Sequence, residues 1–191
     1  NSHSDLYRLI SMKLISSVLT MAMLVAQADR KPNIVFILAD DLGYGELGCY
    51  GQKKIRTPNI DRLASQGIKF THHYTGAPVC APARCVLLTG LHLGHAEIRN
   101  NGDSKNGRKF PGQWPITSGT ITIAEALKEG GYVSGGFGKW GLGPTDTSGS
   151  PIKQGFDRFY GYNCQRNAHS FFPPFLRPFN SSSLRLNRFR F

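Results

Sequence analysis

Acidic residues are scarce in this sequence: 12 aspartates and glutamates stand against 23 lysines and arginines, and the formal net charge is +11. Such an excess favours nucleic acid or an anionic surface as partner only where it clusters on one face. Here the basic residues are spread along the chain, and no nucleic-acid-binding motif accompanies them. We therefore expect no nucleic-acid partner.

A hydrophobic run long enough to cross a membrane is also missing. The main apolar run covers residues 14–25, about twelve residues against the roughly twenty that a spanning helix needs. Lys13 precedes it and Ala-Gln-Ala follows at 26–28, which is typical of a secretory signal cleaved after Ala28. We expect residues 1–11 to be an upstream extension, residues 12–28 a signal peptide, and the mature protein to be periplasmic or secreted without a stable membrane anchor.

The rest of the chain alternates strand-like and helix-like segments. Residues 33–39, NIVFILA, form a continuous β-rich apolar run that predicts a buried strand. Helices are predicted at residues 57–64, 80–91 and 121–129, the last with Thr122 as its cap, and further strands at 68–74 and 132–137. This alternation favours one α/β domain with ligands at the carboxyl ends of its strands. Residues 173–191 have no clear period and are expected to be irregular or disordered.

One motif stands at the start of the second predicted helix. The segment PVCAPARCVLLTG at residues 78–90 places Pro82 and Arg84 after Cys80, just before an apolar helix start. It resembles the sulfatase signature, whose Cys-x-Pro-x-Arg core directs oxidation of the cysteine to formylglycine. The resemblance implies hydrolysis of sulfate esters and an alkaline-phosphatase-like α/β fold, a mostly parallel sheet flanked by helices. Sulfatases are longer, so we expect residues 29–172 to be a partial catalytic domain truncated at its C-terminus.

The resemblance also assigns roles within the motif. It implies that Cys80, converted by a formylglycine-generating enzyme, forms a hydrated aldehyde in which one hydroxyl attacks sulfur and the other later expels sulfate. Arg84 comes four residues later in the predicted helix, so it can face position 80 and bind the diol or the sulfate with its forked donors.

Few cysteines remain once Cys80 is converted. Export places the protein where disulfides form. Cys49, Cys85 and Cys164 then allow at most one internal bridge, and the sequence does not identify the pair.

Two carboxylates, Asp40 and Asp41, directly follow the first predicted strand. Hard cations such as Ca²⁺ or Mg²⁺ prefer oxygen ligands of this kind. The stretch KPNIVFILADDLGYG at residues 31–45 is similar to the sulfatase opening segment, in which both acids bind Ca²⁺. The resemblance implies a metal site made of Asp40, Asp41 and residue 80, with the family's other ligands expected beyond residue 191.

A second segment resembles a sulfatase signature: GYVSGGFGKWGLG at residues 131–143, in which the family's lysine contacts sulfate. Lys139 is therefore predicted to bind sulfate. Many sulfatases carry histidine two residues later, where this chain has Gly141. Residues 155–169 resemble family branches that share this glycine, and His169 is the candidate for the missing imidazole.

Three further histidines lie near the motif in the sequence. His95 lies in a stretch, residues 90–101, that resembles a family segment near the active site, and both a site role and a structural role are open for it. His72 and His73 lie on a predicted strand before the motif, where alternation points one of them outward. We expect neither to be a ligand.

Three functions fit this sequence. We favour a sulfatase; a phosphate or phosphonate monoester hydrolase of the same superfamily uses the same cation and nucleophile, and an inactive fragment is the third. Relative turnover of aryl sulfate and aryl phosphate separates the first two. For a sulfatase, both a carbohydrate sulfate and a simple aryl sulfate are open as substrates.

Overall fold

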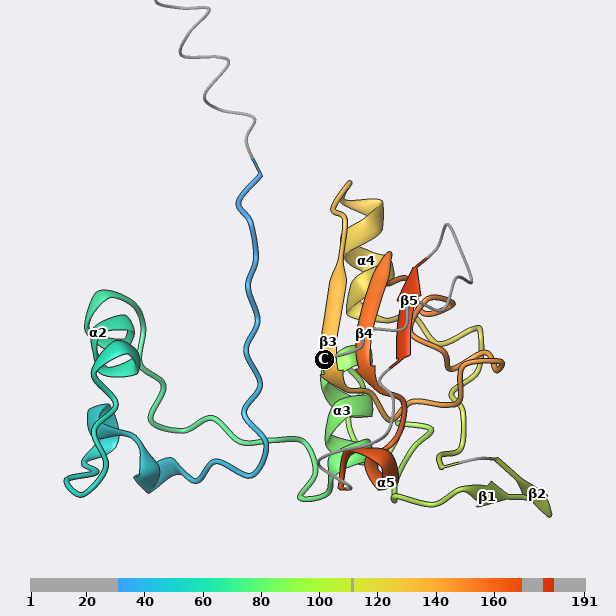
Figure 1. The fold of residues 1–191 in the computed structure, drawn as a ribbon, viewed down its shortest axis with the longest axis horizontal. Helices are drawn as coiled ribbons and strands as arrows, with labels where there is room; N and C mark the ends of the chain where they lie inside the picture. Colours follow the sequence, from blue (N-terminus) through green and yellow to red (C-terminus); the bar gives the residue numbers. More distant parts are fainter. Residues whose placement is uncertain (1–30, 111, 170–176, 181–191) are drawn as a thin grey trace, which may run out of the picture. The chain divides into compact units, whose positions relative to one another are not determined.

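The computed structural model describes residues 31–110, 112–169 and 177–180. The predicted upstream extension and signal peptide lie outside these residues. The chain divides into two compact units, Asn1–Lys69 and Phe70–Phe191, which are described in turn (Figure 1). No helix in the described ranges is long and apolar enough to cross a membrane.

In the first unit, two short 3-10 helices precede one α-helix: η1 (Tyr44–Glu46), η2 (Gly48–Tyr50) and α2 (Pro58–Gln66). Pro58 suits the start of α2 because its φ is preset for a helix and its missing N–H is not needed there. The Asp61 carboxylate accepts hydrogen bonds from the Cys49 backbone N–H at 2.7 Å and the Thr57 hydroxyl at 2.9 Å. One carboxylate thus ties α2 to η2, and the predicted helix at 57–64 is confirmed.

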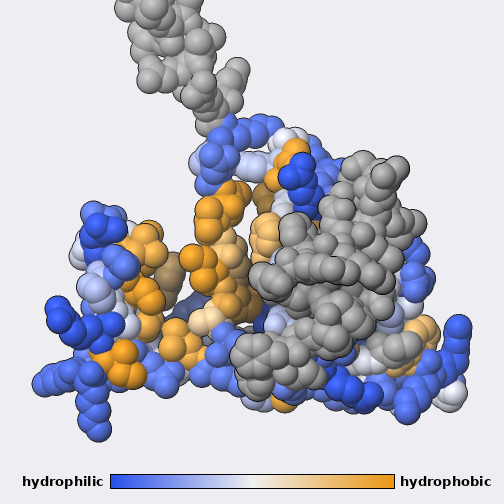
Figure 2. All heavy atoms as spheres, viewed as in Figure 1, coloured by the Kyte–Doolittle hydropathy of each residue, from blue (hydrophilic) through white to orange (hydrophobic). Residues whose placement is uncertain are grey.

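The strands predicted at residues 33–39 and 68–74 are wrong. Residues 31–39 form a drawn-out segment (Figure 1, blue) that pairs with no strand in the described part of the chain. Their apolar side chains are exposed, 84% in the case of Val35, and Figure 2 shows them as a column of hydrophobic residues below the grey trace. A strand requires a hydrogen-bonded neighbour, which an apolar composition alone does not supply.

The second unit contains a three-stranded sheet in the order β3-β4-β5, made of β3 (Gly135–Lys139), β4 (Arg158–Tyr162) and β5 (Arg177–Asn180) (Figure 1). β3 and β4 run parallel, with Lys139 opposite Tyr162, whereas β5 runs antiparallel to β4. The strand predicted at 132–137 therefore exists but begins later. β5 lies within the tail that was expected to be irregular, and this expectation is wrong for residues 177–180.

Within the described residues of the second unit, three helices and a hairpin accompany this sheet. The helices are α3 (Cys80–Thr89), α4 (Ile123–Glu129) and α5 (Gln165–Ala168), and the hairpin joins β1 (Ser104–Lys105) to β2 (Arg108–Lys109). α3 ends at Gly90, whose φ of 68° lets its N–H reach the Val86 carbonyl. α4 begins with a reciprocal cap between Thr122 and Glu125, so the predicted cap is confirmed.

The core of the second unit lies between α3 and the ends of the strands. It consists of Ala81, Cys85, Ala96, Ile98, Ile116, Trp140, Leu142 and Phe159. The Trp140 ring packs edge-on against Phe156 and Phe159, and its indole N–H donates to the Gly149 carbonyl at 2.7 Å. This packing fixes Trp140, the residue just after β3. Lys139 and Gly141 are its two neighbours in the sequence.

Candidate active site

Cys80 is the first residue of α3, and its side chain is half-buried. Ala81 and Cys85, one helical turn apart, are fully buried against the core. Cys80 and Arg84 are likewise four residues apart, so they share a neighbouring strip of the helix. Burial of the Ala81 face therefore fixes the direction in which the Cys80 face points.

Lys139 approaches this face from the sheet. It is the last residue of β3, and its Nζ lies 3.7 Å from Cys80 Sγ. Arg84 donates a hydrogen bond from Nη1 to the backbone carbonyl of Lys139 at 2.6 Å. The structure therefore brings three predicted site residues together from segments 55 or more residues apart in the sequence.

Asn101 completes the start of α3; it lies in the stretch 90–101, but the sequence assigns it no role. Its Oδ1 accepts a hydrogen bond from the Ala81 backbone N–H at 3.0 Å. An amide that receives an unpaired N–H at the start of a helix acts as a cap supplied from a distance. The residue next to Cys80 is thereby attached to the loop that follows α3.

Gln165, within the stretch 155–169, is a second residue to which the sequence assigns no role. This residue of α5 is only 4% exposed, and neither Nε2 nor Oε1 has a hydrogen-bond partner in the described part of the chain. Its amide occupies the space into which a Cβ at Gly141 would project, and Gly141 has a φ of +107°, which favours glycine. The absence of histidine at position 141 thus has a structural counterpart: the Gln165 amide lies there.

His169 directly follows α5, and its side chain is exposed. Its backbone N–H donates to the Gln165 carbonyl at 3.0 Å, while its imidazole makes no hydrogen bond to any of the described residues. The structure therefore does not join His169 to the Cys80 cluster, and its predicted role stays a prediction. His95 lines a cavity described below, and His72 is exposed with its Nδ1 3.0 Å from the Thr71 hydroxyl.

Asp40 and Asp41 belong to the first unit, where both side chains are exposed. Asp41 has a φ of 57°, a left-handed conformation that is uncommon outside glycine and tends to occur at functional positions. Across residues 31–110, 112–169 and 177–180, no group of three or more His, Cys, Asp or Glu side chains forms a metal cluster. The pair nevertheless fits a hard divalent cation in its chemistry, because adjacent carboxylates supply the oxygen ligands that such ions prefer.

Among the cysteines, Cys85 contrasts with Cys80. All four cysteines are free thiols. Burial raises the pKa of the Cys85 thiol above its ordinary value, so this group stays protonated and unreactive. Of the two cysteines in α3, only Cys80 lies beside a lysine ammonium.

In this α/β protein, the end of β3 thus brings a lysine ammonium beside the cysteine that begins α3. The family model described as Sulfatase matches residues 32–173, and the chain belongs to this family. Its fold is accordingly the alkaline-phosphatase-like α/β class, of which it holds a part.

Known sulfatases resemble much of this chain. It is 40% identical to mouse (Mus musculus) steryl-sulfatase over 173 residues, 82% of this chain and 27% of that protein. It is 44% identical to N-acetylgalactosamine-6-O-sulfatase of Bacteroides thetaiotaomicron over 140 residues, 69% and 26% of the two chains. The solved structure of Ps i-CgsB in complex with k-i-k-neocarrahexaose matches with a TM-score of 0.62 and 30% identity over 78% of this chain and 36% of that one. The chain spans about a quarter of the length of these curated relatives.

Proposed function

We propose that the protein carrying this sequence hydrolyses sulfate monoesters, with Cys80 as the residue converted to formylglycine. The observation that carries this proposal is the 3.7 Å approach of the Lys139 ammonium to Cys80 Sγ in a chain of the sulfatase family. A formylglycine-generating enzyme would be the partner that carries out this conversion. The hydrated aldehyde would supply a nucleophile with a second hydroxyl, through which transferred sulfate can leave.

Lys139 would bind a sulfate oxygen. A sulfate ester is negatively charged, so hydrolysis is fast only where positive groups offset the charge that builds up around sulfur. A lysine ammonium is a compact charge with three donors, which suits one oxygen of a tetrahedral anion. Its 3.7 Å distance from Cys80 Sγ supports this role.

Arg84 would position this lysine as well as bind the anion. One of its guanidinium donors holds the Lys139 carbonyl, and this bond joins the end of β3 to α3. The fixed fork of the guanidinium presents its other N–H groups in a plane. Arg84 thus couples the residue that becomes the nucleophile to the residue that binds the ester.

A divalent cation is the second part of the proposal. Asp40 and Asp41 would hold Ca²⁺ or Mg²⁺, and the cation would neutralise charge on the sulfate oxygens. His169 is proposed as the acid for the departing alcohol, since its imidazole is exposed and follows Gln165 closely in sequence.

We propose a carbohydrate sulfate as the substrate class and export as the destination. A relative named for N-acetylgalactosamine-6-O-sulfate cleavage and a structure solved with k-i-k-neocarrahexaose support the first. The signal-like pattern at residues 12–28 supports the second.

The test is to produce the full-length protein in a host that contains a formylglycine-generating enzyme. Peptide mass spectrometry should find an aldehyde at residue 80, and the protein should turn over p-nitrophenyl sulfate faster than p-nitrophenyl phosphate. Cys80→Ala should abolish turnover, whereas Cys49→Ala, a half-buried cysteine outside the proposed site, should retain it. Aldehyde-bearing, Ca²⁺-loaded protein that leaves every sulfate ester intact would contradict the proposal.

A further inference from the structure

Asn101 lies close to Cys80, in the loop between α3 and β1. Its Oδ1 accepts the Ala81 backbone N–H at 3.0 Å, and Ala81 directly follows Cys80 in the chain. The distance from Asn101 Oδ1 to Cys80 Sγ is therefore at most about 9 Å, since one hydrogen bond and four covalent bonds connect the two atoms. A charge on this side chain would consequently act on a group bound at residue 80.

The start of α3 has no side-chain cap of its own. Val79 holds the cap position and makes no side-chain hydrogen bond to the first turn. The Ala81 N–H therefore depends on an acceptor from elsewhere in the chain, and Asn101 supplies it from 20 residues away. Asparagine and aspartate are about equally good helix caps. Stability alone thus gives no reason for asparagine rather than aspartate at this position.

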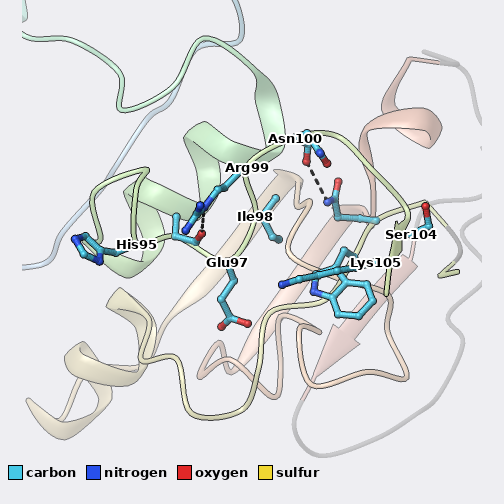
Figure 3. A pocket seen from close by; sticks show the side chains of 10 residues that line it. His95, Glu97, Ile98, Arg99, Asn100, Ser104 and Lys105 are labelled. Carbon is cyan, nitrogen blue, oxygen red and sulfur yellow. Dashed lines mark hydrogen bonds between the residues drawn. The ribbon is translucent and has the colours of Figure 1, made fainter. Parts of the chain in front are cut away.

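The loop that carries Asn101 is anchored at the next residue. The Gly102 carbonyl accepts hydrogen bonds from Gln113 Nε2 and from the Trp114 backbone N–H, each at 3.0 Å. A cavity of about 490 Å³ lies beside this loop, lined among others by His95, Arg99, Asn100 and Lys105 (Figure 3). Asn101 does not belong to the lining of this cavity, because its side chain is directed to α3 instead.

The hydrogen bond to Ala81 also fixes how the Asn101 amide is turned. Because Oδ1 faces the helix, Nδ2 lies on the outer side of the amide, where it donates to no described residue. The side chain is exposed. Aspartate would fill the same space and accept the same N–H, but it would replace the outer donor by an acceptor and add a negative charge.

We infer that Asn101 positions residue 80 through the Ala81 N–H, and that the anion bound at residue 80 requires this cap to be uncharged. The inference rests on the proposed function, which places the sulfate at residue 80. Lys139 Nζ, 3.7 Å from Cys80 Sγ, supplies positive charge at the same place. An aspartate at position 101 would oppose that charge, whereas the amide of asparagine leaves it undiminished.

The test uses full-length, aldehyde-bearing protein and inorganic sulfate as the probe. Asn101→Asp should unfold in urea at the wild-type midpoint, because the two residues cap equally well. In calorimetry at low ionic strength it should bind sulfate roughly fivefold more weakly, and the difference should shrink as salt is added. KM for p-nitrophenyl sulfate should rise by a similar factor, while kcat stays within about twofold of the wild-type value.

Asn101→Ala should show the converse pattern. Without the acceptor, residue 80 is held less firmly, so the urea midpoint should fall and kcat should drop by roughly three- to tenfold. Its sulfate affinity should stay within about twofold of wild type, because no charge has been added. A residue that served stability alone would lower the urea midpoint when replaced by alanine and would tolerate aspartate without loss of sulfate affinity.

Asn106→Asp is the matched control, because it adds the same charge at the tip of the hairpin. The left-handed φ of 51° at this position suits aspartate as well as asparagine. This variant should match wild type in sulfate affinity, KM and urea midpoint. Wild-type sulfate affinity in Asn101→Asp, an equal loss in Asn106→Asp, or unchanged kcat in Asn101→Ala would each overturn the inference. Failure of the proposed function is separate, since it appears as absent aryl sulfate turnover by the wild type, whereas calorimetry and unfolding need no turnover.

Discussion

Lys139 serves two purposes at the scale of single residues. Its ammonium faces Cys80 Sγ, while its backbone carbonyl accepts from Arg84. One residue therefore sets both the charge beside the thiol and the attachment of β3 to α3. Its substitution separates the two, because a side-chain change removes the charge and leaves the carbonyl.

Replacing Lys139 by alanine should therefore reduce activity without unfolding the protein. Loss of one preorganised donor at a developing negative charge commonly lowers turnover by about 10² to 10³. We expect kcat/KM for p-nitrophenyl sulfate to fall by roughly this factor while the thermal midpoint changes little. Lys153→Ala, an exposed lysine of the same unit, is the control. Equal activity of both variants would exclude the sulfate-binding role.

Gly141 and Gln165 are also coupled at the scale of single residues, because the Gln165 amide lies where a side chain at position 141 would begin. Gly141→Ala should lower the free energy of unfolding by about 1–2 kcal/mol, because it places a side chain at a strained positive φ and also displaces the buried Gln165 amide. In the double variant with Gln165→Ala the clash is gone and only the backbone strain persists. Urea unfolding of the four proteins measures this coupling. Strict additivity would show that the two side chains do not compete for space.

The predictability of this site differs from residue to residue. The sequence predicts Cys80, Arg84 and Lys139 because each stands in a motif in which the reaction requires that residue type. Asn101 and Gln165 act through neighbours that only the folded chain brings close, at Ala81 and Gly141. No local pattern marks such an amide, so sequence alone does not reveal it.

At the scale of elements, helices were predicted well and strands poorly. α2 and α4 begin at local signals, Pro58 and the Thr122 cap, and the structure places both close to the predicted ranges. A strand depends on a partner elsewhere in the chain. The apolar run at 33–39 carries a strong strand pattern but pairs with no described residue, whereas β5 has no such pattern and pairs with β4.

Asp157 connects three of these elements. Its carboxylate accepts from the Ser134 N–H at 2.9 Å and from Lys128 Nζ at 3.3 Å, joining α4 to the starts of β3 and β4. The Ser134 N–H, followed by the Lys128 charge, holds the pKa of Asp157 below its ordinary value. The stabilisation is therefore present above the unfolded pKa of about 3.9 and is lost as pH falls through the lower folded pKa.

Asp157→Asn should consequently be less stable than wild type at neutral pH, and the difference should shrink in acid. Thermal unfolding between pH 7 and about pH 3 measures both midpoints. Asp146→Asn, which alters an exposed acid elsewhere in the unit, is the matched control. A gap between wild type and Asp157→Asn that is the same at every pH would contradict the assignment.

At the scale of the whole molecule, each of the two units contains cysteines whose reactivity reports whether that unit is folded. Cys49 belongs to the first unit and is half-buried, whereas Cys85 and Cys164 are buried in the second. Thiols buried in a core react only after the surrounding structure opens. The rate at which each cysteine is alkylated thus measures the opening of its own unit.

Brief alkylation of native protein at neutral pH should label Cys49, together with any Cys80 that has escaped conversion. Cys85 and Cys164 should be labelled only in denaturant, and Cys85 is further protected because burial raises its pKa. Peptide mass spectrometry across a urea series reads each site. Labelling of Cys85 at the rate of Cys49 in the native protein would show that the core of the second unit is open.

The glycine at position 141 also restricts how this sequence can change over generations. A histidine introduced there meets the Gln165 amide and takes on a positive φ that favours glycine. A smaller residue at position 165 would remove the first obstacle and would leave a void of its own. The effect of a substitution at either position therefore depends on the residue at the other.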